Sequence, residues 1–176
     1  MYLTEAEILD TPLALASTCD YFKKRDGDLA EFFAKHTQRK FAVLGCGSSF
    51  MLAKSAATLL ASMPDTVASA IPAGDYILNY DFWQETVRGS IVILLSRSGK
   101  TSEMVWALKH IKETLGCPAI SITMKAENDL TPLCDLNLVL DWCYDNSVCQ
   151  TRTVTNLYTA SLLLAAKYAG KDDLRK

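Results

Sequence analysis

From residue 41 onward, short apolar segments of the chain alternate with longer amphipathic ones. The apolar segments are FAVLG (41–45), VASAI (67–71), SIVILL (90–95), AISIT (119–123) and LNLVL (136–140). SIVILL is a β-branched apolar run of the kind that parallel sheets bury on both faces. The longer segments between the runs have the composition and periodicity of helices. The alternation predicts an α/β protein of three layers, with a doubly wound, five-stranded parallel sheet between helices.

The first forty residues follow a different pattern. Thr4 and Glu7 have the spacing of a capping box, which predicts the start of a long helix. An acidic, glycine-containing break at 26–28 separates it from a second, shorter helix. We interpret 1–40 as an N-terminal helical extension, too short to fold alone, and 41–176 as a single α/β domain.

The composition excludes several classes of protein. Of the residues, 49% are hydrophobic and 22% are charged, and the formal net charge is −2, which argues against nucleic-acid binding through a broad basic face. No apolar run approaches the ~20 residues that cross a bilayer, and the acidic N-terminus is unlike an export signal. The six cysteines are scattered, with no CxxC and no nearby His. We expect a cytoplasmic protein with free thiols, without a membrane partner, a metal ion or another cofactor.

In a doubly wound sheet, the loops that follow the strands share one edge, where α/β proteins bind their ligands. The first such loop is GCGSS (45–49), whose glycines permit a sharp turn and whose hydroxyls can donate to an anion. Phe50 stands where a dinucleotide-binding fingerprint requires its third glycine. Cys46, near the helix start, could have a lowered thiol pKa, and we assign it no role. The loop is either an anion site or only a tight turn.

The second loop, SRSGKT (96–101), follows SIVILL and opens a helix. It offers three hydroxyls, a glycine and two cations where free backbone N–H groups and the helix dipole favour negative charge. A hydroxyl-rich helix start can also serve only as a cap, but this combination favours a phosphate site. A Walker A loop is disfavoured because its first glycine would fall at Leu94, inside a strand.

The third loop, NSVCQTRT (146–153), precedes the last predicted helix. Gln150, Thr151 and Arg152 gather at the start of that helix, on the same predicted edge of the sheet. Alone, they would indicate a capping sequence with an exposed arginine. The two other anion-suited loops at this edge favour a ligand-binding role instead.

Together the three loops resemble those of the SIS (sugar isomerase) domain. The resemblance rests on VLGCGSS, LLSRSGKTSE and SVCQTRTVT and spans residues 41–169. EILDTPLAL, near the N-terminus, is similar to the helix that precedes the first SIS domain in two-domain members. The chain most resembles the tagatose-6-phosphate ketose/aldose isomerase-like proteins and the isomerase domain of glucosamine-6-phosphate synthase. The resemblance implies a flavodoxin-like SIS fold.

The resemblance also implies which residues contact the ligand, here a phosphorylated sugar. The phosphate would be bound by Ser96, Arg97, Ser98, Gly99, Thr101 and Ser48. The sugar would lie against Gly47, Ser49, Val148, Gln150, Thr151 and Arg152. Lys100 replaces the usual acid of the synthases, and Gln150-Thr151-Arg152 replaces their Ser-Thr-Lys. These departures favour the isomerase-like branch.

The activity implied is that of a phosphosugar isomerase, an aldose–ketose isomerisation through an enediol, on a sugar with or without an amino group. This reaction needs a base near C1 and C2, an acid that opens the ring, and a fixed phosphate. The sequence offers no evident base, because His36 and His110 are expected on the surface and Glu103 is explained equally well by its helix start. The catalytic residues therefore stay unassigned.

Two-domain members of the family place the base in their second SIS domain. We therefore expect this chain to be the N-terminal half of a longer isomerase, able to bind a sugar phosphate but turning it over poorly. A complete single-domain isomerase is one alternative, and a non-catalytic sugar-phosphate sensor is another. The sensor is less favoured because 1–40 lacks the basic recognition helix of a DNA-binding domain.

The family also implies self-association, as a homodimer or higher homo-oligomer with sites near the subunit interface. The last helix, 153–169, is apolar around enough of its circumference to form such an interface. Packing of this helix on its own sheet explains the pattern equally well.

Overall fold

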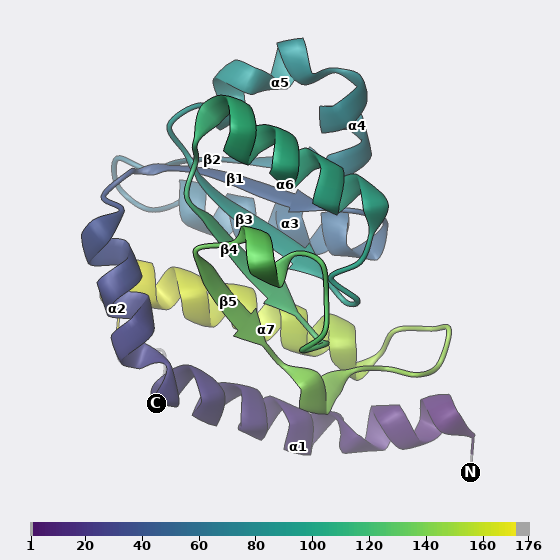
Figure 1. Ribbon diagram of the computed structural model, residues 1–176. Coiled ribbons are helices and arrows are strands. Elements are labelled where there is room, and N and C mark those ends of the chain that lie inside the picture. The colour runs from purple at the N-terminus through teal and green to yellow at the C-terminus, as the bar shows by residue number, and fades with distance from the viewer. Residues whose placement is uncertain (1, 172–176) are drawn as a thin grey trace.

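The computed structural model describes residues 2–171, which form a single parallel sheet with helices on both faces (Figure 1). The helices are α1 (Leu3–Lys24), α2 (Asp26–Lys35), α3 (Ser48–Ala61), α4 (Ala73–Leu78), α5 (Tyr80–Val87), α6 (Ser102–Leu115) and α7 (Arg152–Tyr168). The strands are β1 (Lys40–Gly45), β2 (Val67–Pro72), β3 (Ile91–Ser96), β4 (Ala119–Thr123) and β5 (Leu136–Val139). Two 3-10 helices, η1 (Thr131–Leu133) and η2 (Asp141–Cys143), flank β5. Within residues 2–171, no helix has the length and apolar character that a membrane span requires.

The sheet confirms the predicted α/β class and the five strands. Its order is β2-β1-β3-β4-β5, and every neighbouring pair is parallel. Each strand lies within one residue of its predicted segment at either end. The order reverses between β1 and β3, since the chain first adds β2 on one side of β1 and then places β3 on the other. Neighbouring loops diverge at such a reversal and leave room for a ligand.

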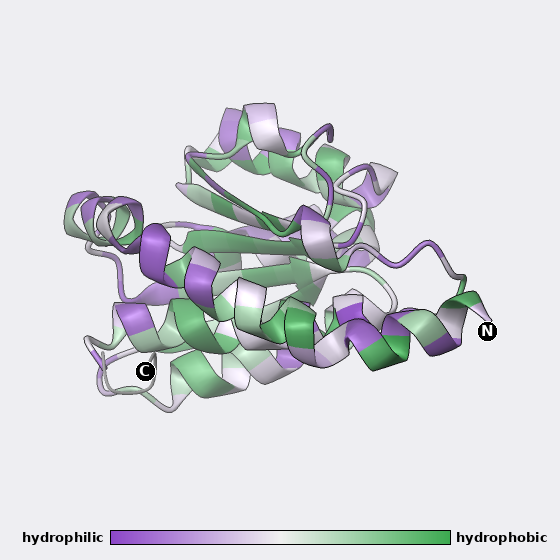
Figure 2. Ribbon diagram, turned by 90° about the horizontal axis from the view of Figure 1, so that it is seen from below, coloured by the Kyte–Doolittle hydropathy of each residue, from purple (hydrophilic) through white to green (hydrophobic). Residues whose placement is uncertain are grey.

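Both faces of the sheet are buried at its central strands, which explains why β1 and β3 are almost continuously apolar. Along β1, Phe41 and Val43 belong to the cluster that includes α1, α2, α3 and α7. Ala42 and Leu44, which alternate with them, belong to the cluster on the side of α4, α5 and α6. In Figure 2 the strands are almost wholly hydrophobic, whereas the helices carry both polar and apolar residues. Side chains alternate between the faces of a strand, so β1, β3 and β4 contribute to both cores. The buried side chains of the edge strand β5, Leu136 and Leu138, belong to the first core only.

The N-terminal helices α1 and α2 pack against α7, on one face of the sheet. Phe22 and Leu29 are fully buried in the same core as α7, and the Thr18 hydroxyl donates to Asn156 over 2.5 Å. The predicted separation into two helices is confirmed, but the break lies at Arg25 and not at 26–28, because α2 already begins at Asp26. Acidic residues there suit the positive end of a helix.

The predicted capping box is also wrong. Helix α1 begins at Leu3, and the Glu5 carboxylate accepts a hydrogen bond from the Tyr2 backbone over 3.3 Å. Glu7 lies beyond the first turn and is 2% exposed. Its partners come from another part of the chain, as shown below.

The apolar circumference of α7 is largely used within the chain, between the sheet and α1 (Figure 1). On α1, in contrast, large apolar side chains remain exposed, with Leu9 at 67% and Leu13 at 71%. Exposed apolar surface therefore lies on α1 more than on the helix that the sequence favoured.

We expect Phe22→Ala to lower the free energy of unfolding by about 3–5 kcal/mol, because it empties a closed part of the core. Leu13→Ala, on the exposed side of the same helix, should change it by about 0.5 kcal/mol or less. Urea denaturation followed by circular dichroism measures both. Equal, small effects would show that α1 does not share the core of the sheet.

Candidate functional site

The three predicted loops meet at the carboxyl edge of the sheet. They enclose a cavity of about 120 Å³ beside the ends of β1 and β3. Its lining consists of Cys46, Ser49, Leu95, Ser96, Arg97, Ser98, Thr101, Met104 and Gln150. Six of the residues predicted from the sequence are in this set: Ser49, Ser96, Arg97, Ser98, Thr101 and Gln150. The lining is rich in hydroxyls and contains no Asp, Glu or His.

The loop at 96–101 folds back on its own hydroxyls. The Gly99 backbone donates to the Ser96 hydroxyl over 3.0 Å, and the Lys100 backbone donates to Ser98 over 3.1 Å. Helix α6 then starts after Thr101, and no side chain caps its first N–H groups. Uncapped N–H groups at a helix start form a preorganised anion site.

Gly99 is required here for two reasons. Its φ of +64° lies in the left-handed region, and a Cβ at this position would come within 2.5 Å of Asn128 Cβ. Asn128 holds its own loop, since its side-chain oxygen accepts from the Leu130 and Thr131 backbones over 3.0 and 2.9 Å. The Asp129 backbone also donates to the Gly99 carbonyl over 3.1 Å. The loop after β4 therefore supports the loop after β3 from behind.

The third loop reaches the cavity through Gln150. Its side-chain amide lies 3.5 Å from the exposed Ser48 hydroxyl, which joins the first loop to the third. The Gln150 side-chain oxygen and the Thr151 hydroxyl are buried, and neither has a hydrogen-bond partner among residues 2–171. An acceptor left without a donor beside a cavity can bind a ligand hydroxyl.

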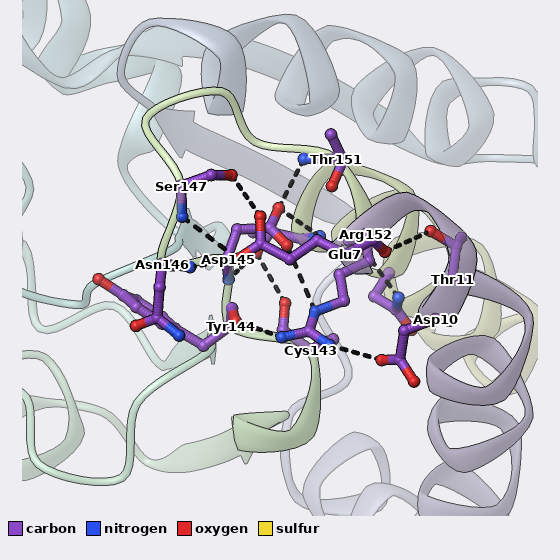
Figure 3. A network of polar contacts seen from close by, with 12 residues as sticks. Glu7, Asp10, Thr11, Cys143, Tyr144, Asp145, Asn146, Ser147, Thr151 and Arg152 are labelled. Atoms are coloured by element: carbon purple, nitrogen blue, oxygen red, sulfur yellow. Dashed lines mark hydrogen bonds and ion pairs between the residues drawn. The ribbon is translucent and has the colours of Figure 1, made fainter. Parts of the chain in front are cut away.

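Other predicted residues take different positions. Gly47 forms the turn before α3, with a φ of +56°. Val148 is 94% exposed at the tip of the third loop. Arg152 points away from the cavity and forms ion pairs with Asp10 at 2.5 Å and with Asp145 at 3.3 Å (Figure 3). The structure therefore does not bring Val148 or Arg152 into the cavity lining.

The family model named SIS domain matches residues 36–167. This chain belongs to the SIS domain family. A comparison with curated proteins yields no match. Because the matched range begins at residue 36, helix α1 of this SIS protein lies outside it.

Solved structures share this SIS fold at low sequence identity. Tagatose-6-phosphate ketose/aldose isomerase from Escherichia coli aligns with a TM-score of 0.83 and 21% identity, over 97% of this chain and 48% of its own. The C-terminal domain of glucosamine-fructose-6-phosphate aminotransferase from Francisella tularensis aligns with a TM-score of 0.77 and 16% identity, over 98% of this chain and 48% of its own. The Vibrio vulnificus NanR protein complexed with ManNAc-6P aligns with a TM-score of 0.71 and 17% identity, over 98% of this chain and 63% of its own. The chain thus spans about half the length of the isomerase, and the likeness concerns the fold.

Two residues near the site were not predicted for it. Asn128 follows β4, so the rule that selected the loops after β1 and β3 also applies to it. Glu7 is buried beneath the third loop and accepts hydrogen bonds from the Asn146 and Ser147 backbones over 2.7 and 3.2 Å, and from the Ser147 hydroxyl (Figure 3). No sequence signal links Glu7 to this distant loop.

Two titratable groups near the site, Cys46 and Glu7, have a shifted pKa. Burial raises the pKa of the Cys46 thiol, and the nearby Glu103 carboxylate raises it further, so the lowered pKa considered for this thiol is wrong. Burial also raises the pKa of Glu7, but its hydrogen bonds from Ser147 and Asn146 outweigh burial and hold that pKa below 4.5. Glu7 is therefore a carboxylate at neutral pH.

The two histidines lie away from the cavity lining. His110 Nδ1 is 3.1 Å from the hydroxyl of the fully buried Tyr76, and His36 packs on Phe32. Both histidines are half-buried, where the sequence predicted surface positions. Within the described range, no three His, Cys, Asp or Glu side chains are grouped to hold a metal ion.

A larger hollow of about 660 Å³ lies at the opposite end of α3 and α7. It is lined largely by apolar side chains such as Leu59, Met63 and Leu163. It lacks the combination of clustered hydroxyls and a helix start that distinguishes the smaller cavity, which we regard as the functional site.

We expect Gly99→Ala to lower the free energy of unfolding by about 1–3 kcal/mol, since it combines an unfavourable φ with a contact to Asn128. Gly27→Ala is the matched control, because a Cβ there meets nothing within 4 Å. Its effect should be stabilising and below about 1 kcal/mol. Urea denaturation measures the free energy of unfolding of both variants. Equal changes for Gly99→Ala and Gly27→Ala would contradict the close approach at Gly99.

The lowered pKa of Glu7 predicts acid sensitivity. A carboxyl whose pKa is lower in the folded state contributes stability above its unfolded pKa and loses it as the pH falls through the folded value. Below pH 4.5, the ordinary pKa of this group, wild type should therefore lose stability relative to Glu7→Gln. Thermal unfolding from pH 3 to pH 7 measures the difference, and a pH-independent difference would contradict the assignment.

Proposed function

We propose that this SIS domain binds a phosphorylated sugar, with the phosphate in the loop at 96–101. The observation that carries the proposal is the uncapped start of α6, which opens beside the hydroxyls of Ser96, Ser98 and Thr101. Backbone N–H groups, hydroxyls and an arginine are the donors that phosphate oxygens accept from. The SIS family membership supports the same ligand class.

The positive charge needed for phosphate is local, since the whole chain has a net charge of −2. Arg97 lines the cavity, and its guanidinium donates to the Ser147 carbonyl over 3.3 Å. This contact holds the arginine beside the third loop and leaves further donors for a ligand, because a guanidinium has five N–H groups. Lys100 is exposed in the same loop and adds to the positive potential.

The sugar would lie toward the first and third loops. Gln150 offers an acceptor without a partner and, near Ser48, a donor amide. Sugar hydroxyls both donate and accept, so an amide of this kind suits them. Ser49 and the turn at Gly47 complete this side of the proposed site. Thr151 starts α7, and its buried hydroxyl is a further candidate contact.

For the reaction, we propose that the chain supplies the phosphate anchor of an aldose–ketose isomerase. An enediol mechanism needs a base, and no carboxylate or imidazole lines the cavity. The base would then come from outside these residues, as in an isomerase about twice this length. The alternative is a sensor without catalysis, which the same absence of a base and the likeness to NanR favour.

Two further properties belong to this proposal. Six free cysteines fit a reducing compartment such as the cytoplasm. The homo-oligomer expected from the family stays a prediction, for which the exposed Leu9 and Leu13 on α1 are the candidate surface. Sedimentation equilibrium of the purified chain would contradict it by giving a monomer.

A thermal-shift titration tests the ligand class. Fructose 6-phosphate, tagatose 6-phosphate, glucosamine 6-phosphate and N-acetylmannosamine 6-phosphate should raise Tm, whereas free fructose and ATP with Mg²⁺ should not. A ligand at 100 times its Kd adds about 2.7 kcal/mol, which corresponds to roughly 5–10 °C for a chain of this size. Ser98→Ala and Thr101→Ala should reduce the shift.

Thr58→Ala is the matched control, because it removes an exposed hydroxyl on α3 that bonds only within its helix. The absence of a shift with every sugar phosphate would contradict the proposal. An assay for ketose formation, run on the same samples, separates the two candidate functions. Turnover supports the isomerase, and saturable binding without turnover supports the sensor or an anchor that lacks its base.

A further inference from the structure

Glu7 is a buried carboxylate that serves one distant loop. It lies on α1, 2% exposed, and the described hydrogen-bond partners of its carboxylate are Asn146 and Ser147. One of its oxygens accepts from both backbones, and the other accepts from the Ser147 hydroxyl. A buried charge is costly unless it is fully hydrogen-bonded, and bonds to an ionised group are strong. The contact therefore fixes where this loop lies.

Ser147 connects Glu7 to Arg97, which lines the cavity. Its backbone and hydroxyl bind Glu7, while its carbonyl accepts from Arg97 Nη1 over 3.3 Å. Arg97 lines the cavity and lies in the loop at 96–101. A single residue thus joins a buried group of α1 to a cation of the proposed phosphate site.

The other end of the loop is fixed separately. The Asp145 carboxylate accepts from the Thr151 and Thr153 backbones over 2.5 and 3.1 Å. Arg152 joins Asp145 to Asp10 of α1 (Figure 3). With both ends held, the segment between them, 148–150, carries Gln150 to the cavity.

We propose that Glu7 is a positioning residue for the ligand site, which holds the third loop so that Gln150 and Arg97 face the bound sugar phosphate. The inference rests on the proposed function. It makes α1, outside the range of the family model, a part of the binding machinery. Glu7 does not line the cavity, so it acts through Ser147.

A purely structural role would lower stability alone, whereas a positioning role lowers affinity at temperatures where the variant is folded. If Glu7 positions the third loop, its loss should weaken contacts to the sugar more than contacts to the phosphate. Gln150 lies in the third loop, whereas the phosphate loop has its own hydrogen bonds. Affinity for a sugar phosphate, compared with affinity for inorganic phosphate, separates the two roles.

The experiment is isothermal titration calorimetry of the full chain at 15 °C, with fructose 6-phosphate, glucosamine 6-phosphate and inorganic phosphate. Glu7→Gln should weaken binding of the sugar phosphates about tenfold, the usual effect of losing a hydrogen bond to a charged group, and of phosphate about threefold or less. Ser147→Ala removes the hydroxyl, with its contacts to Glu7 and to the Cys149 carbonyl, but keeps both backbone contacts, and it should act in the same direction. The double variant should lose less affinity than the sum of the two single losses, because both changes break the contact between Glu7 and the Ser147 hydroxyl.

Asp20→Asn is the matched control, since it removes a carboxylate of the same helix that pairs only with exposed Lys23, at 3.5 Å. Its affinities should equal those of wild type. If Glu7→Gln does not fold, Ser147→Ala decides. Wild-type affinity in the folded variants, or equal losses for phosphate and sugar phosphates, would overturn the inference. If wild type binds none of the sugar phosphates, the proposed function itself fails.

Discussion

The reversal of winding between β1 and β3 is the constraint on which the site depends. Strands that are all parallel must be joined by crossovers, and right-handed crossovers bring the start of each following helix to the same edge. In this sheet the connections from β1 and β3 leave in opposite directions, toward β2 and β4. The space between them is the cavity, and the N–H groups at the start of α6 open into it. In the proposed function, the backbone alone would provide an anion-binding position.

The proposed phosphate ligand also agrees with the local chemistry. Serine and threonine hydroxyls supply donors without adding volume, and Gly99 allows the loop to pass close to Asn128. The cavity has a cation but no group able to take a proton from carbon at neutral pH, since the Cys46 thiol has a raised pKa. These residues therefore suit the proposed binding, while catalysis would require a base from elsewhere. This distinction is what separates an isomerase from a sensor on the same fold.

The region around Glu7 shows that the site extends beyond its lining. Glu7, Asp145 and Arg152 are buried or largely buried, and their hydrogen bonds and ion pairs join α1 to the loop before α7. Such groups are stable in a low-dielectric interior only as a complete set. A loop with few apolar contacts of its own is in this way held by charged groups of a helix far away in sequence. The tip at Val148 remains exposed.

The sheet, its strand limits and the loops that line the cavity could be predicted from the sequence, because apolar runs and turn residues act over short distances. Ser96, Ser98 and Thr101 could be selected because strand ends share an edge in any parallel sheet. The same rule applies to Asn128 after β4, whereas the partners of Glu7 and Arg152 become visible only in the folded chain. Glu7 resembled a helix cap and Arg152 a ligand contact, since nothing local distinguishes a charge that faces a ligand from one that faces a partner. The partner of a buried charge exists only after folding, when segments more than a hundred residues apart come within hydrogen-bond distance.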